Sequence, residues 1–155
     1  MDRVYDKGQP TIYIGTMSVE ITFPLEFIVQ GTPVSLQVKR PESKTVWKER
    51  VKQASCHALP EGHYATESPL TVTLFYFPNG EMQGDVDNIV KPVLDALDKH
   101  IYFDDRQIER VWVQKFEPGR VFQFRNPSES LAEALTGRKP LLYIRFGDDT
   151  TEGLI

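Results

Sequence analysis

The sequence contains a single cysteine, Cys56, so a framework of intramolecular disulfides is excluded. It has no run of about 18 apolar residues, the length that a membrane-spanning helix needs, so we expect no membrane partner. Residues 1–15 lack the basic-then-apolar order of a secretory signal. Together these absences favour a cytoplasmic protein.

The sequence also lacks an excess of basic residues, as its net charge of -4 shows. Since nucleic-acid-binding domains are usually basic, this balance argues against a protein that coats DNA nonspecifically. Asp148, Asp149 and Glu152 contribute three of the negative charges, within residues 148–155, which we predict to be a disordered acidic tail. The remainder, residues 1–147, is nearly neutral and has the length of one compact domain. A metal site made of aspartates stays compatible with this charge, because bound divalent cations offset carboxylates.

Apolar patterning predicts a mixed α/β (α+β) domain, with a sheet of about four to six strands packed against two main helices. Alternating or β-branched segments predict strands over residues 11–14, 20–30, 69–77, 108–116 and 141–146. We expect the large aromatic side chains Trp47, Phe103 and Trp112 to pack in the core. For Phe103, stacking on or wedging into opened DNA is the alternative.

Helical spacing of apolar side chains predicts the two main helices, over residues 44–59 and 88–100. Ser43 is the expected N-cap of the first. A third, shorter helix is predicted over residues 127–135, with Asn126 as its N-cap and a proline at the first helical position.

Two acidic pairs flank the second main helix. Asp85 and Asp87 precede it, and in an extended stretch residues two apart point to the same side. Asp104 and Asp105 follow it. If both ends of the helix meet one edge of the sheet, the four carboxylates converge into a cluster of hard oxygen ligands suited to Mg²⁺, with Mn²⁺ as a substitute. Such an ion binds phosphate and activates water for phosphodiester hydrolysis.

Lys91 lies four residues after Asp87, one helical turn along the same face. An ammonium there suits contact with a scissile phosphate and stabilisation of transition-state charge. Ordinary structural roles remain open for all of these residues. The first aspartate pair suits a turn or helix cap, the second suits solvated surface, and Lys91 suits an ion pair with Asp87 or Asp95.

Residues 84–97 read GDVDNIVKPVLDAL, and residues 102–108 read YFDDRQI after a short gap. This combination resembles the signature of the RusA-type Holliday junction resolvases, which has the form D-[LIV]-D-N-x-x-K, an L/F-D-A-L helix and a D-D-x-Q-[IV] turn. The resemblance is specific because several spaced elements agree at once. Outside residues 84–108 only the order of strands and helices fits.

The resemblance implies a small α/β domain that forms a homodimer and resolves four-way DNA junctions by paired, symmetric, Mg²⁺-dependent nicks in recombination and repair. It implies no small-molecule cofactor. The family's catalytic positions, whose aspartates bind the metal, correspond here to Asp85, Asp87, Asp105 and Lys91. Asn88 and Asp104 also match, and we expect Asn88 to orient a ligand and Asp104 to add a metal ligand. A two-fold dimer suits the approximate two-fold symmetry of the junction.

Basic residues in and before the first main helix are the expected contacts for DNA phosphates. Neutralisation of phosphates by such residues gives salt-sensitive affinity without sequence preference. The residues assigned to DNA binding are Lys39, Arg40, Lys44, Lys48, Lys52 and Arg106. The alternative is a solvated helix face with ion pairs along it.

Two features depart from the family pattern. Residues 79–84, directly before Asp85, contain no basic side chain where an arginine run is expected, and residues 117–140 are longer than a simple hairpin. Two alternatives to a junction resolvase therefore stay open. One is a branched-DNA-binding module without catalysis, and the other is a nuclease that acts on flaps or other branched DNA.

Overall fold

The computed structural model describes residues 3–6, 9–12, 18–34 and 40–154. A short antiparallel hairpin near the N-terminus joins β1 (Arg3–Asp6) to β2 (Gln9–Ile12). The strand predicted over residues 11–14 overlaps β2, and its last two residues lie outside the described range. No helix within the described residues combines the length and apolarity needed to cross a membrane.

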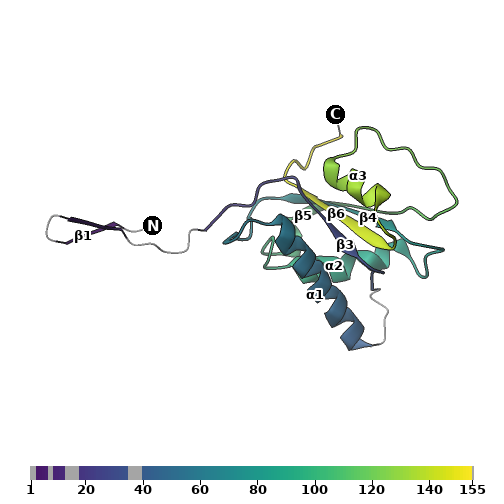
Figure 1. Ribbon diagram of the computed structural model, residues 1–155, viewed down its shortest axis with the longest axis horizontal. Helices are drawn as coiled ribbons and strands as arrows, with labels where there is room; N and C mark the ends of the chain where they lie inside the picture. Colours follow the sequence, from purple (N-terminus) through teal and green to yellow (C-terminus); the bar gives the residue numbers. More distant parts are fainter. Residues whose placement is uncertain (1–2, 7–8, 13–17, 35–39, 155) are drawn as a thin grey trace.

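The main sheet of the described chain has four strands in the order β3–β6–β4–β5. Their bounds are β3 (Leu25–Gln30), β4 (Leu70–Phe77), β5 (Ile108–Lys115) and β6 (Leu141–Gly147). β6 runs antiparallel to both of its neighbours, whereas β5 runs parallel to β4. The predicted mixed sheet is therefore confirmed (Figure 1).

Helices cover both faces of this sheet (Figure 1). In the described chain they are α1 (Pro41–Ala58), α2 (Val90–Leu97) and α3 (Glu129–Thr136). Val72 and Leu74 of β4 face the core beneath α1 and α2, while Phe75 and Phe77 face a second core beneath α3. A strand buried on both faces needs apolar residues at nearly every position, which explains the composition of β4.

The chain between β4 and β5 positions the acidic residues. The helix predicted over residues 88–100 forms in two parts, a 3₁₀ turn η1 (Val86–Ile89) and then α2, which ends at Leu97. After α2 the chain turns back through Ile101 and Tyr102, both fully buried. Burial of these two side chains fixes the path by which the second acidic pair reaches the start of β5.

The predicted N-caps of the other helices are wrong. α1 begins at Pro41, ahead of Ser43, because a proline has the φ of the first helical position and needs no N–H partner there. α3 is capped by Ser128, whose hydroxyl accepts a hydrogen bond from the Leu131 amide at 3.1 Å. Asn126 instead adopts a φ of 46°, a left-handed turn conformation that asparagine tolerates.

Residues 117–140 form a structural layer of the domain. They contain α3, and Phe122 and Phe124 pack against the second core. The Glu117 carboxylate accepts a hydrogen bond from the Met82 amide at 2.7 Å, which ties this segment to the loop that leads to η1. The extra length therefore covers the second face of the sheet.

Two of the three aromatic side chains predicted for the core are exposed. Trp47 is buried as predicted, but Trp112 is 56% and Phe103 is 47% exposed. Trp112 lies on β5, an edge strand, where its ring is 5.1 Å from the Phe75 ring of the second core. Phe103 lies in the exposed turn before β5.

The acidic segment after β6, predicted as a tail, makes contacts with the sheet. The Glu152 carboxylate lies 3.3 Å from the Arg145 guanidinium of β6. The Glu152 carbonyl accepts a hydrogen bond from Arg110 of β5 at 2.8 Å. One of the three negative charges of this segment is therefore paired with the domain.

Leu97 offers a test of how firmly α2 is held. Its side chain is fully buried against the sheet. We expect Leu97→Ala to lower the free energy of unfolding by about 2–5 kcal/mol, because it removes buried methyl groups and leaves a cavity. Val121→Ala, at a position that is 99% exposed, should change it by less than about 0.5 kcal/mol. Urea denaturation measures both, and equal losses would contradict the packing described for α2.

Candidate active site

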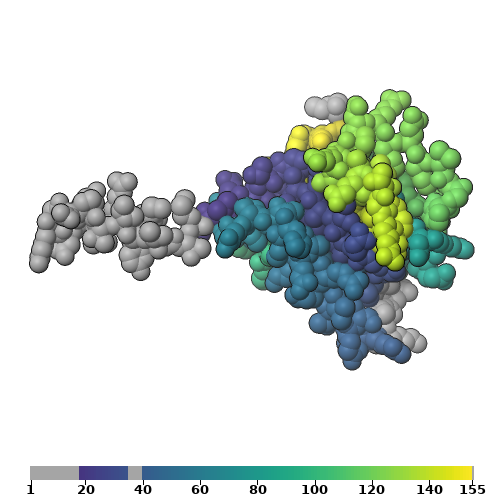
Figure 2. All heavy atoms as spheres, viewed as in Figure 1, coloured from purple at the N-terminus to yellow at the C-terminus, as the bar shows by residue number. Residues whose placement is uncertain are grey.

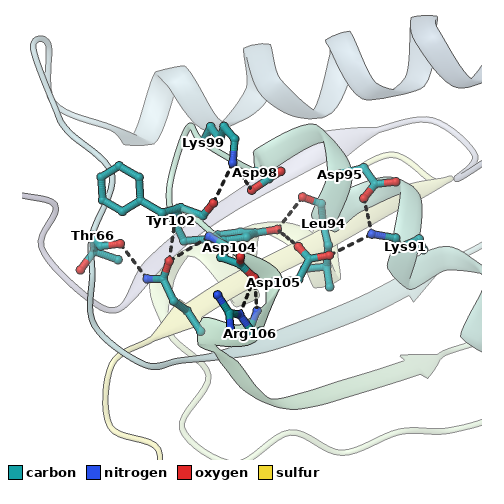
Figure 3. Close-up of polar contacts among 12 residues, drawn as sticks. Thr66, Lys91, Leu94, Asp95, Asp98, Lys99, Tyr102, Asp104, Asp105 and Arg106 are labelled. Atoms are coloured by element: carbon teal, nitrogen blue, oxygen red, sulfur yellow. Dashed lines mark hydrogen bonds and ion pairs between the residues drawn. The ribbon is translucent and has the colours of Figure 1, made fainter.

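Lys91 of α2 lies between two carboxylates (Figure 3). Its Nζ is 2.6 Å from Asp95 Oδ1, one turn along the helix, and 2.9 Å from Asp105 Oδ2. Asp105 begins a second 3₁₀ turn, η2 (Asp105–Gln107), directly before β5. Hydrogen bonds to Asp105 and then to Asp95 raise the pKa of Lys91. The side chain is therefore a permanent positive charge that joins the two ends of the signature.

A buried tyrosine holds the other side of the Asp105 carboxylate. The Tyr102 hydroxyl lies 3.3 Å from Asp105 Oδ1 and 2.5 Å from the carbonyl oxygen of Leu94, to which it donates. Burial, followed by the negative charge of Asp105, raises the pKa of Tyr102. The hydroxyl thus keeps its single proton, and the Asp105 carboxylate lies between this neutral hydroxyl and the Lys91 ammonium.

Asp104, the neighbour of Asp105, acts as a helix cap. Its carboxylate accepts a hydrogen bond from the Arg106 amide at 2.9 Å, as the N-cap of η2. This bond is the largest cause of the lowered pKa of Asp104. The two adjacent aspartates thus have different surroundings: Asp104 binds backbone, and Asp105 binds Lys91 and Tyr102.

Gln107 also holds this turn in place, through hydrogen bonds made by both the oxygen and the nitrogen of its side-chain amide. Its Oε1 accepts hydrogen bonds from the Phe103 and Asp104 amides at 2.7 and 3.0 Å, which completes a capping box. Its Nε2 donates to the carbonyls of Thr66 and Ser68 at 2.7 and 3.1 Å. One side chain therefore attaches the acidic turn to the segment that precedes β4.

Asp85 and Asp87 are exposed on η1 and its N-terminal flank. Among the described residues, no group of three or more His, Cys, Asp or Glu side chains is placed to hold a metal ion. The expected convergence of four carboxylates is therefore not present in this arrangement. Asp105 is held by Lys91, and Asp104 by its cap.

The basic residues expected to contact DNA lie mostly along one face of α1. Four of them are spaced four residues apart: Arg40, Lys44, Lys48 and Lys52. Lys48 Nζ is 3.9 Å from Asp95 Oδ2, so this face reaches the site. Figure 2 shows α1 along the surface of the molecule. Arg106 is exposed beside Asp104, and Lys39 lies outside the described residues.

Comparison with protein families gives one match, to a model described as endodeoxyribonuclease RusA, over residues 26–122. That span covers more than half of the chain and includes α1, β4, the whole signature and β5. This chain belongs to the RusA endodeoxyribonuclease family. The resemblance seen in the signature is confirmed, and the family assigns the chain to the nucleases. Comparison with curated proteins found no significant match.

Two residues of this RusA-family site had no role assigned from sequence, Tyr102 and Gln107. Asp95 was expected only as one of two possible ion-pair partners of Lys91, and the structure shows that contact. Gln107 could have been found, because a glutamine three residues after a capping aspartate is typical of a capping box. Nothing in the sequence distinguishes Tyr102 from other buried aromatics. Asn88, the expected supporting residue, lies half-buried in η1.

Gln107→Leu tests whether this side chain holds the acidic turn. It removes an acceptor for two amides and a donor to two carbonyls, so we expect the free energy of unfolding to fall by about 1–3 kcal/mol. Hydrogen exchange of the Phe103 and Asp104 amides should accelerate, because both lose their partner. Gln123→Leu, at an exposed position, serves as the control. Unchanged exchange in Gln107→Leu would show that the turn is held by other contacts.

Proposed function

We propose that this RusA-family protein is an Mg²⁺-dependent endonuclease that resolves four-way DNA junctions by paired symmetric nicks in recombination and repair. The contact between Lys91 and Asp105 carries this proposal, because it joins the two halves of the family signature at one exposed place. We also propose that the protein acts as a homodimer. Two cuts related by a two-fold axis need two identical sites at a fixed spacing, which a two-fold dimer supplies.

We assign Mg²⁺, or Mn²⁺ in its place, to Asp85, Asp87 and Asp105. All three are exposed, and carboxylate oxygens are the donors that these hard cations prefer. When bound, such an ion supplies a coordinated water of lowered pKa and neutralises charge on the phosphate. Asn88, between the first pair and α2, is assigned to orienting one of these ligands. Asp104 is assigned to the cap of η2 rather than to the metal, because its carboxylate already binds backbone.

Lys91 is assigned to the scissile phosphate. A lysine side chain is already protonated near neutral pH, so Lys91 acts as a fixed positive charge and not as a general base. A fixed charge beside the phosphate stabilises the negative charge that increases on its oxygens in the transition state. In the protein alone, Asp95 and Asp105 hold the ammonium in the exposed first turn of α2, where DNA can reach it.

The basic face of α1 is assigned to the DNA backbone. Its four cations run from the N-cap residue Arg40 to Lys52, and Lys48 among them lies next to Asp95. Lysine and arginine in such a row bind phosphates in succession and set the register of DNA on the protein. Arg106, in the acidic turn itself, is 90% exposed and is also assigned to the DNA backbone.

The assignment of the site is tested by measuring junction cleavage in three variants, Asp85→Asn, Asp87→Asn and Asp105→Asn. Each change keeps the size of the side chain and removes one negative charge, so we expect the cleavage rate to fall by at least about a hundredfold. Junction binding should persist. The assay uses labelled four-way junction, flap and linear duplex, with Mg²⁺ or with EDTA.

Asp104→Asn is the matched control, because asparagine caps a helix as well as aspartate does. It should cleave at a rate close to that of the wild type. Normal cleavage by the three other variants would show that the site is elsewhere. If the wild type cleaves flaps but not junctions, the substrate assignment is wrong. If it cleaves neither, only a branched-DNA-binding module remains.

The salt dependence of junction binding tests the role of α1. In the triple variant Arg40→Gln, Lys44→Gln and Lys52→Gln, the slope of log K against log salt should become shallower by up to about 0.9 for each phosphate that is no longer neutralised. Lys48 is left unchanged because of its contact with Asp95. The control is Arg125→Gln with Arg138→Gln, which flanks α3 on the other side of the sheet. Equal slopes for both variants would contradict the proposed DNA-binding face.

A further inference from the structure

Asp95 is assigned neither to the metal nor to DNA in the proposed reaction, yet it makes the shortest ion-pair contact of Lys91. Its Oδ1 lies 2.6 Å from Lys91 Nζ, and its Oδ2 lies 3.9 Å from Lys48 Nζ of α1. The neighbours Leu94 and Ala96 are buried against the sheet, so the backbone that carries Asp95 is held in place. Asp95 is therefore a fixed acceptor for Lys91 that does not depend on the turn before β5.

Asp105 differs from Asp95 because two cations compete for its carboxylate, the Lys91 ammonium and the proposed divalent ion. In the protein alone, its Oδ2 lies 2.9 Å from the Lys91 ammonium (Figure 3). A divalent cation bound to the same carboxylate would be close to that ammonium, and like charges at short distance repel. Metal binding at Asp105 and the Lys91–Asp105 ion pair therefore oppose each other. When the ion binds, the position of the Lys91 side chain then depends on its other partner, Asp95.

We propose that Asp95 is a positioning residue, which keeps the Lys91 ammonium in place when a divalent cation binds Asp105 and displaces the ammonium from it. This inference rests on the proposed function, in which Asp105 is a metal ligand. With Asp95 present, the ammonium leaves Asp105 and still has a carboxylate partner beside the scissile phosphate. With the charge of Asp95 removed, Asp105 is the remaining carboxylate in contact with Lys91 among the described residues, so the ammonium competes harder with the ion. Asp95 thus favours metal binding through Lys91, without touching the metal.

A double-mutant cycle of Asp95→Asn and Lys91→Met measures this effect, with Mn²⁺ binding to the DNA-free protein as the readout. The electron paramagnetic resonance signal of free Mn²⁺ gives the dissociation constant without any cleavage. We expect Asp95→Asn to weaken Mn²⁺ binding about three- to fivefold, the scale of an exposed ion pair. Lys91→Met should tighten Mn²⁺ binding by about threefold or more, because the competing cation is gone. In the Lys91→Met background, Asp95→Asn should change the dissociation constant by less than about twofold.

Asp98→Asn is the matched control for the loss of one negative charge near the end of α2. Asp98 lies 4.0 Å from Lys99 Nζ and makes no ion pair with Lys91. It should change the Mn²⁺ dissociation constant by less than about twofold in either background. Urea denaturation of each variant establishes that it is folded.

The inference is overturned if Asp95→Asn weakens Mn²⁺ binding equally with and without Lys91, because Asp95 would then act on the ion directly. It is also overturned if Lys91→Met leaves Mn²⁺ affinity unchanged or lowers it. Asp105→Asn separates this failure from failure of the proposed function. If Asp105→Asn removes Mn²⁺ binding while the cycle shows no coupling, only the role of Asp95 is wrong. If the wild type binds no Mn²⁺, or if Asp105→Asn binds Mn²⁺ as tightly as the wild type does, the metal assignment and the inference fail together.

Discussion

The ion pair between Lys91 and Asp105 makes one site out of two segments that a helix separates. Lys91 lies in the first turn of α2, and Asp105 follows the buried turn that brings the chain back to β5. Both side chains are nearly half exposed, at 48% and 43%, so the pair adds little to the free energy of unfolding. Its importance lies in placement. It sets a positive and a negative charge side by side at the surface, where a phosphate and a metal ion would meet.

The site has a braced part and an open part. Asp105 belongs to the braced part, because Tyr102, Gln107 and the Asp104 cap fix its turn through hydrogen bonds to backbone. Asp85 and Asp87 belong to the open part, exposed on a single 3₁₀ turn. Uncompensated carboxylates repel one another, which favours separated side chains until a cation compensates their charge. In the proposed metal site, one carboxylate would therefore be fixed and the two others would be free to move toward the ion.

The parts of the structure that the sequence predicted are those that depend on repeated patterns. The alternation in β4, the apolar spacing of α2 and the order of elements in the signature each rest on many residues at once. The N-caps were wrong because the local rule fits more than one residue, as Asn126 and Ser128 show. Trp112 was misplaced because its exposure depends on β5 being an edge strand, which only the strand order reveals. The contact between Lys91 and Asp105 could not be read from spacing, since it depends on how the chain turns after Leu97.

The distribution of charge reconciles a negative protein with a DNA substrate. Charges in water act over about 8–10 Å, so DNA responds to the nearest face rather than to the net charge of -4. One face of α1 is basic, while the signature is acidic, and Lys48 beside Asp95 marks the boundary between them. In the proposed reaction, phosphates are attracted along α1 and repelled by bare carboxylates at the site. A divalent cation at the carboxylates removes that repulsion, and a bound phosphate in turn favours the cation. Metal and DNA should therefore bind with positive coupling, each raising the affinity of the site for the other.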